Sequence, residues 1–215
     1  MRMCKESVSF YTFLILYVGG NSILALQDVT TDLFGSESYG TVAAFGDFNS
    51  DKQTDIFIIR QQSELVIFLA DLKAPYFKPK VRIPKGNFTK DYIISSVVPG
   101  DYDGDSKMDV LLTVHTKDKP VWETSVFVFW GNNQTLEAGG RIELNRTFTD
   151  EPLVMDFNGD MIPDIFGVVN GVTQVCYLKE RKMVWQPALG SGVKKMHVPH
   201  SNAFIDLNQD FTAGK

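Results

Sequence analysis

Cysteine is nearly absent from the chain, which has two in 215 residues. Cys4 lies in an N-terminal apolar stretch, so Cys176 is the one cysteine in the rest of the sequence, inside the apolar run 175–178. A lone cysteine cannot form an internal disulfide, which excludes a small disulfide-stapled domain. We expect Cys176 to be a buried thiol of the core.

Clusters of lysine and arginine are also missing, and 21 basic against 26 acidic residues leave a net charge of −5. A protein that follows a phosphate backbone needs a basic face, so no nucleic-acid partner is predicted. Catalytic signatures are absent as well, because His115, His197 and His200 lie outside any HExxH or GxSxG pattern. We therefore predict that the chain is not an enzyme.

Long hydrophobic runs are confined to the N-terminus, where Arg2 and Lys5 precede the apolar stretch 10–18 and small residues follow. This arrangement predicts a secretory signal peptide over 1–22, cleaved between 22 and 27. The alternative is a buried strand. No later segment is long enough for a membrane helix, so the sequence predicts a product that is secreted or held at the extracellular face of the membrane.

Three N-glycosylation sequons agree with export, and they predict glycans on Asn87, Asn133 and Asn145. Three tryptophans are candidates for exposed side chains that stack on sugars or a partner. Trp130 ends an apolar run and is expected in the core, whereas Trp122 and Trp185 lie near prolines and stay open.

The most informative feature is a nine-residue acidic segment that recurs at 47–55, 101–109 and 156–164, with an incomplete fourth copy from 206. The starts at 47, 101, 156 and 206 are 54, 55 and 50 residues apart, the length of a four-stranded propeller blade with its loops. Apolar runs flank each copy, which indicates strand, loop, strand units. The predicted fold is all-β, a partial β-propeller of about three and a half four-stranded repeats over 23–215.

Each acidic segment places oxygen-bearing side chains at positions 1, 3, 5 and 9, and a main-chain carbonyl at position 7. Ca²⁺ takes six to eight oxygen ligands, and a cation would relieve the repulsion between carboxylates placed so close together. The predicted ligands are Asp47, Asn49, Asp51, Gln53 and Asp55; Asp101, Asp103, Asp105, Lys107 and Asp109; and Asp156, Asn158, Asp160, Ile162 and Asp164, with Gln53, Lys107 and Ile162 contributing main-chain carbonyls.

Acidic segments of this kind also occur in EF-hands and in metal-free turns. An EF-hand needs flanking helices and a glutamate at position 12, where this chain has Ile58, Leu112 and Gly167 between β-rich runs. Asp/Asn-rich turns also form without metal, but three copies in one register favour an ion site. The second segment has four carboxylates and the others have fewer, so the second loop is expected to bind Ca²⁺ most tightly.

With Phe45–Gly46 ahead of the first segment, the pattern resembles the FG-GAP repeat of integrin α-subunit propellers. From 28 to 212, including the motifs at 76–81, 98–105 and 156–160, the chain more closely resembles the T-cell immunomodulatory protein family. This resemblance implies Ca²⁺ loops on one face, a cell-surface or shed glycoprotein with a C-terminal membrane span, a protein partner on a cell surface, and a role in modulating T cells.

The chain departs from that family in two respects. It ends inside the fourth loop, where Gly214 stands at the ninth position, and it lacks the membrane span. The sequence therefore predicts a partial propeller, either a fragment, a shortened splice product or an incomplete gene model, which would be soluble if exported. The alternative function is a calcium-stabilised accessory or lectin-like domain of a larger secreted hydrolase, since FG-GAP blades also occur appended to hydrolases.

Overall fold

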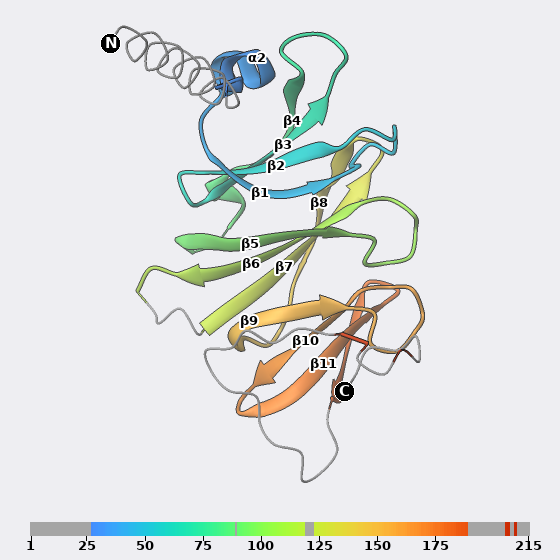
Figure 1. The fold of residues 1–215 in the computed structure, drawn as a ribbon. Helices are drawn as coiled ribbons and strands as arrows, with labels where there is room; N and C mark the ends of the chain where they lie inside the picture. The colour runs from blue at the N-terminus through green and yellow to red at the C-terminus, as the bar shows by residue number, and fades with distance from the viewer. Residues whose placement is uncertain (1–26, 89, 119–122, 189–204, 207–208, 210–215) are drawn as a thin grey trace, which may run out of the picture.

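The computed structural model describes residues 27–88, 90–118, 123–188, 205–206 and 209 (Figure 1). The predicted signal peptide at 1–22 lies outside this part of the chain. So do Trp122, His197 and His200, and most of the fourth acidic segment.

Twelve strands make up more than half of the described residues, and the described helical elements are one short helix, α2 (Thr30–Phe34), and two 3₁₀ turns, η2 (Gly35–Glu37) and η3 (Lys85–Asn87). The strands form three antiparallel meanders of four, which we call blades 1, 2 and 3. Blade 1 comprises β1 (Thr41–Gly46), β2 (Asp55–Arg60), β3 (Glu64–Ala70) and β4 (Phe77–Ile83); blade 2 comprises β5 (Tyr92–Gly100), β6 (Asp109–Thr116), β7 (Glu123–Asn132) and β8 (Thr135–Glu143); blade 3 comprises β9 (Phe148–Met155), β10 (Asp164–Val169), β11 (Val172–Lys179) and β12 (Lys182–Pro187).

The three blades follow one another down the view in Figure 1. Blade 1 is a separate four-stranded sheet, whereas blades 2 and 3 are joined because the start of β7 pairs with β9 through Glu123↔Thr149 and Thr124↔Phe148. The all-β prediction is confirmed. The arrangement is propeller-like, and the described residues do not close a ring.

The position of each strand in its blade follows from its sequence. The second strands, β2, β6 and β10, are apolar and buried along almost their whole length, because each is covered on both faces. The edge strands β4 and β12 carry lysines and prolines and are largely exposed. Proline has no N–H to donate, so Pro79 is tolerated on the edge strand β4.

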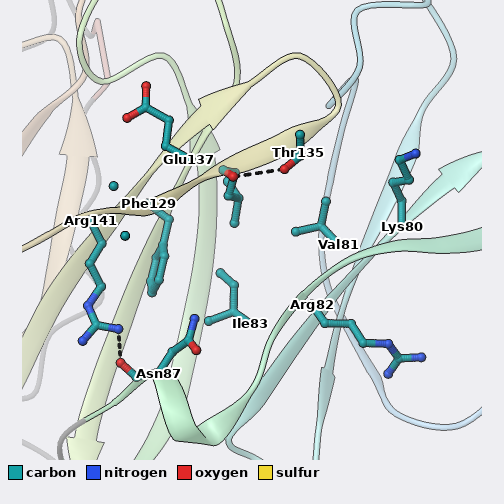
Figure 2. A pocket seen from close by; sticks show the side chains of 12 residues that line it. Lys80, Val81, Arg82, Ile83, Asn87, Phe129, Thr135, Glu137 and Arg141 are labelled. Atoms are coloured by element: carbon teal, nitrogen blue, oxygen red, sulfur yellow. Dashed lines mark hydrogen bonds between the residues drawn. The ribbon is translucent and has the colours of Figure 1, made fainter.

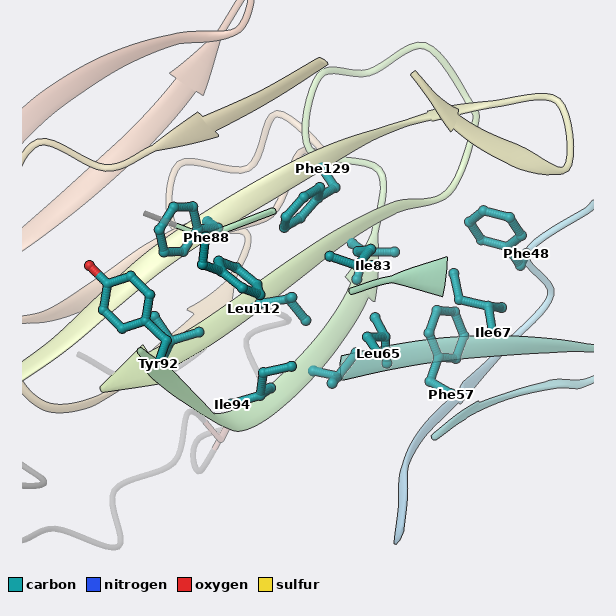
Figure 3. Close-up of a cluster of buried hydrophobic side chains, with 14 residues drawn as sticks. Phe48, Phe57, Leu65, Ile67, Ile83, Phe88, Tyr92, Ile94, Leu112 and Phe129 are labelled. Carbon is teal, nitrogen blue, oxygen red and sulfur yellow. The ribbon is translucent and has the colours of Figure 1, made fainter. Parts of the chain in front are cut away.

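Hydrophobic side chains pack between successive blades. Figure 3 shows the first cluster, in which Phe57, Leu65 and Ile67 of blade 1 meet Tyr92 and Leu112 of blade 2. Its aromatic rings meet edge to face, as in the Phe88–Phe127 pair with centroids 5.3 Å apart. The outer face of blade 1 is covered by α2, whose Phe34 ring lies 5.6 Å from that of Phe68.

The second cluster lies between blades 2 and 3 and contains both Trp130 and Cys176. Trp130 is 2% exposed and Cys176 is fully buried, as predicted for both. Burial raises the pKa of the Cys176 thiol to about 12. Trp185 is half-buried against Phe148, with ring centroids 5.7 Å apart, so it is not a free stacking platform.

Candidate metal-binding loops

The three acidic segments form the loops between the first and second strands of the blades, where the sequence places them. They lie at the same end of successive blades, on the right-hand side of Figure 1. We call them loop 1 (47–55), loop 2 (101–109) and loop 3 (156–164).

All three loops share one backbone path, which the aspartate at position 1 organises. Its Oδ2 accepts the N–H of position 6 at 2.8 to 2.9 Å, and its Oδ1 accepts the N–H of position 5 at 3.0 to 3.2 Å. Positions 4 and 6 have positive φ throughout: Ser50 60°, Gly104 80° and Gly159 81°, then Lys52 69°, Ser106 64° and Met161 67°. The sharp bend at Gly104 and Gly159, which glycine accommodates easily, is also present in loop 1, where Ser50 replaces glycine.

Positions 3 and 5 turn their oxygens toward the inside of the loop. The side-chain oxygen of position 3 accepts the N–H of position 5, and a carboxylate oxygen of position 5 accepts the N–H of position 7. In loops 1 and 3 the asparagine at position 3 also donates from Nδ2 to the carboxylate at position 5. In loop 2 Lys107 Nζ donates to Asp105 at 2.8 Å instead.

The aspartate at position 9 has a structural role that the sequence did not reveal. Asp55, Asp109 and Asp164 begin β2, β6 and β10 and are at most 1% exposed. One carboxylate oxygen of each accepts the N–H of position 2 at 2.8 Å. The other oxygen of Asp55 accepts the N–H of Ala70, and that of Asp109 accepts the N–H of Gly131. The ninth residue therefore also ties loops 1 and 2 to a neighbouring strand.

Burial of these carboxylates opposes their negative charge. It raises the pKa of Asp109 to about 7, with Asp103 and Asp101 adding repulsion. It raises the pKa of Asp164 to about 6, and that of Asp55 in the same direction. A cation inside the loop would favour the ionised form of each.

Position 2 of each loop is aromatic, and in loops 1 and 2 this residue anchors the loop in the core. Phe48 belongs to the cluster between blades 1 and 2, and Tyr102 to the cluster between blades 2 and 3. Phe157 of loop 3 is half-buried and stacks on Phe166 at 5.7 Å. The position of a loop is thus coupled to the packing of neighbouring blades.

Loop 2 has the most complete oxygen set. Ligand oxygens of Asp101, Asp103 and Asp109 all lie within 4.8 Å of one another, the one such grouping of three acidic, histidine or cysteine side chains among the described residues. Oxygens at about 2.3–2.6 Å from a shared Ca²⁺ lie at most about 5 Å apart, so these residues fit the ion. Asp105 and the Lys107 carbonyl would complete the set predicted from the sequence.

The site has one further participant that the spacing of the acidic segments did not indicate. Arg181, in the turn between β11 and β12, donates from Nε to Asp103 Oδ2 at 2.6 Å. Its two terminal nitrogens donate to Glu137 of β8 at 2.8 and 3.0 Å. These hydrogen bonds lower the pKa of Glu137 and raise that of Arg181.

Catalytic chemistry has little support in the described part of the chain. His115 is its one histidine and lies at the opposite end of β6 from loop 2. The loop carboxylates are paired with backbone N–H groups in a repeated pattern, which suits ion coordination better than proton transfer.

The three sequon asparagines are all exposed. Figure 2 shows Asn87 on η3 in a groove between β4 and β8 that Lys80, Arg82 and Arg141 also line. Asn133 lies in the turn between β7 and β8 with φ 40°. Asn145 lies between β8 and β9, where its Oδ1 accepts Trp185 Nε1–H at 2.9 Å.

Loops 1 and 2 lie in a part of the chain that matches a known family of repeats. Residues 47–112, which include loops 1 and 2, match the family described as FG-GAP-like repeat. Human T-cell immunomodulatory protein is 55% identical over 199 residues, covering 93% of this chain and 32% of the human protein. The chain is similar to the T-cell immunomodulatory proteins over nearly its whole length. The resemblance predicted from the sequence is thus confirmed.

Other relatives agree with this result. The rat T-cell immunomodulatory protein is 52% identical over 204 residues, covering 95% of this chain and 33% of its own length. Protein linkin of Caenorhabditis elegans is 29% identical over 227 residues, covering 94% of this chain and 34% of its own length. The chain spans about one third of the length of these relatives. No helix in the described ranges is long and apolar enough to cross a bilayer.

Proposed function

We propose that the chain is a calcium-stabilised FG-GAP propeller segment. The observation that carries this proposal is the shared conformation of loops 1, 2 and 3, each of which turns oxygens at alternate positions toward its own centre. Side chains at positions 1, 3, 5 and 9 and the carbonyl of position 7 would hold each ion.

The ion would stabilise structure and perform no chemistry. It would neutralise the buried ninth aspartate and fix the aromatic anchor at position 2, so loop order and blade packing would be gained together. A ligand that binds only the folded state stabilises it by RT ln(1 + [L]/Kd). Millimolar Ca²⁺ near or above Kd would add about 1 kcal/mol per occupied site.

We further propose that the segment is a non-enzymatic recognition module outside the cell, with a protein partner on a cell surface. Support comes from the similarity to proteins named T-cell immunomodulatory protein, from the exposed sequons, and from the proposed Ca²⁺ loops, since extracellular modules commonly bind Ca²⁺ with dissociation constants of about 10⁻⁴–10⁻³ M. Modulation of T-cell behaviour is the role proposed for the longer protein.

Thermal unfolding of the full chain tests the calcium proposal. The melting temperature is expected to rise between chelator and millimolar Ca²⁺, and isothermal titration calorimetry should detect binding. Asp101→Asn, Asp47→Asn and Asp156→Asn should each reduce the rise. Glu143→Gln removes an exposed carboxylate outside the loops and should not. Equal melting temperatures with chelator and with Ca²⁺ would contradict the proposal.

A further inference from the structure

Arg181 crosses from blade 3 to loop 2 of blade 2 and is held there by several contacts. Besides its bonds to Asp103 and Glu137, its guanidinium lies 4.8 Å from the centre of the Trp130 ring. The Asp103 side chain is 6% exposed, against 36% for Arg181 and 30% for Glu137. The Asp103 partner of this contact is therefore well shielded from water, and salt screens a partly buried ion pair less than it screens an exposed one.

Both carboxylate oxygens of Asp103 are engaged in this arrangement. Oδ1 accepts the N–H of Asp105 at 3.0 Å, and Oδ2 accepts from Arg181. Lys107 holds Asp105 in addition. Two of the four carboxylates of loop 2 thus already have a positive partner.

Loops 1 and 3 show no such pair among the described residues, because position 3 is the neutral Asn49 or Asn158. The turn of blade 2 that corresponds to the Arg181 turn is Asn133–Gln134. Both turns have two successive residues with positive φ, 40° and 67° in blade 2 and 50° and 62° in blade 3. The blade 2 turn carries no charge. The contact between a positively charged turn residue and the acidic loop of the preceding blade is therefore seen at loop 2 and is not shared by the corresponding turn of blade 2.

We propose that Arg181 lowers the Ca²⁺ affinity of loop 2 by holding Asp103, so that this loop binds less tightly than its four carboxylates predict. The inference rests on the proposed calcium function. An ion that enters loop 2 must share Asp103 with the guanidinium or displace it, and a divalent ion about 5 Å from a fixed positive charge is repelled even in high dielectric. Removal of the guanidinium is expected to tighten binding at loop 2 about tenfold.

The experiment is a Ca²⁺ titration of the full chain by calorimetry, with Tb³⁺ luminescence and its displacement by Ca²⁺ as a second readout. Loop 2 is identified as the binding step lost in Asp101→Asn. Arg181→Gln should tighten this step about tenfold. Lys182→Gln is the matched control, because the neighbouring Lys182 is 79% exposed and pairs only loosely with Glu180 at 3.8 Å.

Arg181 has positive φ, so a second variant protects the test against misfolding. Arg181→Asn removes the same charge with a residue that tolerates this backbone conformation, and it should shift the affinity in the same direction. Circular dichroism in chelator checks that each variant is folded.

The outcomes separate the two proposals. Unchanged or weaker Ca²⁺ binding at loop 2 in both Arg181 variants overturns the inference and leaves the calcium function standing. Weaker binding would show that Arg181 orients Asp103 for the ion. If neither the wild type nor the variants bind Ca²⁺ at all, both proposals fall.

Discussion

Asp109 Oδ1 accepts the backbone N–H of Gly131 at 2.7 Å, and this bond joins the end of loop 2 to β7. Gly131 approaches so closely that a Cβ built on it would lie 2.3 Å from the carbonyl oxygen of Met108. The loop and the strand can make this contact only because the side chain is absent.

Substitution Gly131→Ala is expected to destabilise the fold by about 1–3 kcal/mol, since backbone must move to admit the methyl group. Urea unfolding followed by circular dichroism measures the loss. Gly86→Ala is the control, because a Cβ at Gly86 meets nothing within 4 Å. Similar stability of the two variants would contradict the proposed close approach.

The aromatic anchors should differ in their contribution to stability. Tyr102 is fully buried and Phe48 is 4% exposed, so Tyr102→Ala and Phe48→Ala should each cost about 3–5 kcal/mol. Phe157→Ala should cost less, because Phe157 is half-buried. Chemical unfolding of the three variants tests the order, and a Phe157 variant at least as unstable as the other two would overturn it.

Glu37 neutralises the fully buried guanidinium of Arg60, whose Nη1 donates to Glu37 Oε2 at 2.8 Å. This bond holds the pKa of Glu37 below its usual value of 4.5, despite some opposing desolvation. A lowered pKa contributes stability that is present above the unfolded value and is lost as pH falls through the folded value.

Glu37→Gln should therefore melt below the wild type at pH 7, and the difference should shrink as the pH falls below about 4. Glu143→Gln serves as the exposed control. A constant difference from pH 7 to pH 3 would argue against an ionised Glu37 as the partner of Arg60.

Cys176 should resist thiol reagents in the native state. The thiol is buried and its pKa is raised to about 12, so little thiolate is present or accessible at pH 8. A Cys4→Ser chain should react with Ellman's reagent only on unfolding. Rapid reaction of the folded protein would show that the core between blades 2 and 3 is open.

Glycosylation of the exposed sequons is expected when the chain passes through the secretory pathway. Treatment with an N-glycosidase should lower the apparent mass, and Asn87→Gln, Asn133→Gln and Asn145→Gln should each remove one step. A secreted product whose mass does not change on treatment would remove this support for the extracellular proposal.

The sequence by itself determined the all-β class, the three blades and the positions of their acidic loops. These features depend on local pattern: side-chain oxygens at alternate positions determine the path of each loop, and the short flanking runs are rich in the β-branched and aromatic residues that favour strands. The recurrence at 54 and 55 residues showed that the segments belong to one repeat.

Only the tertiary structure decided which distant residues meet these loops. Arg181 and Asp103 are 78 positions apart, and Gly131 and Asp109 are 22 apart. Their meeting depends on how blade 3 packs on blade 2 and how β7 lies beside β6, which no local pattern specifies. The number of carboxylates therefore predicts the highest Ca²⁺ affinity for loop 2. The packing of the blades places the guanidinium of Arg181 beside this loop, which that number does not take into account.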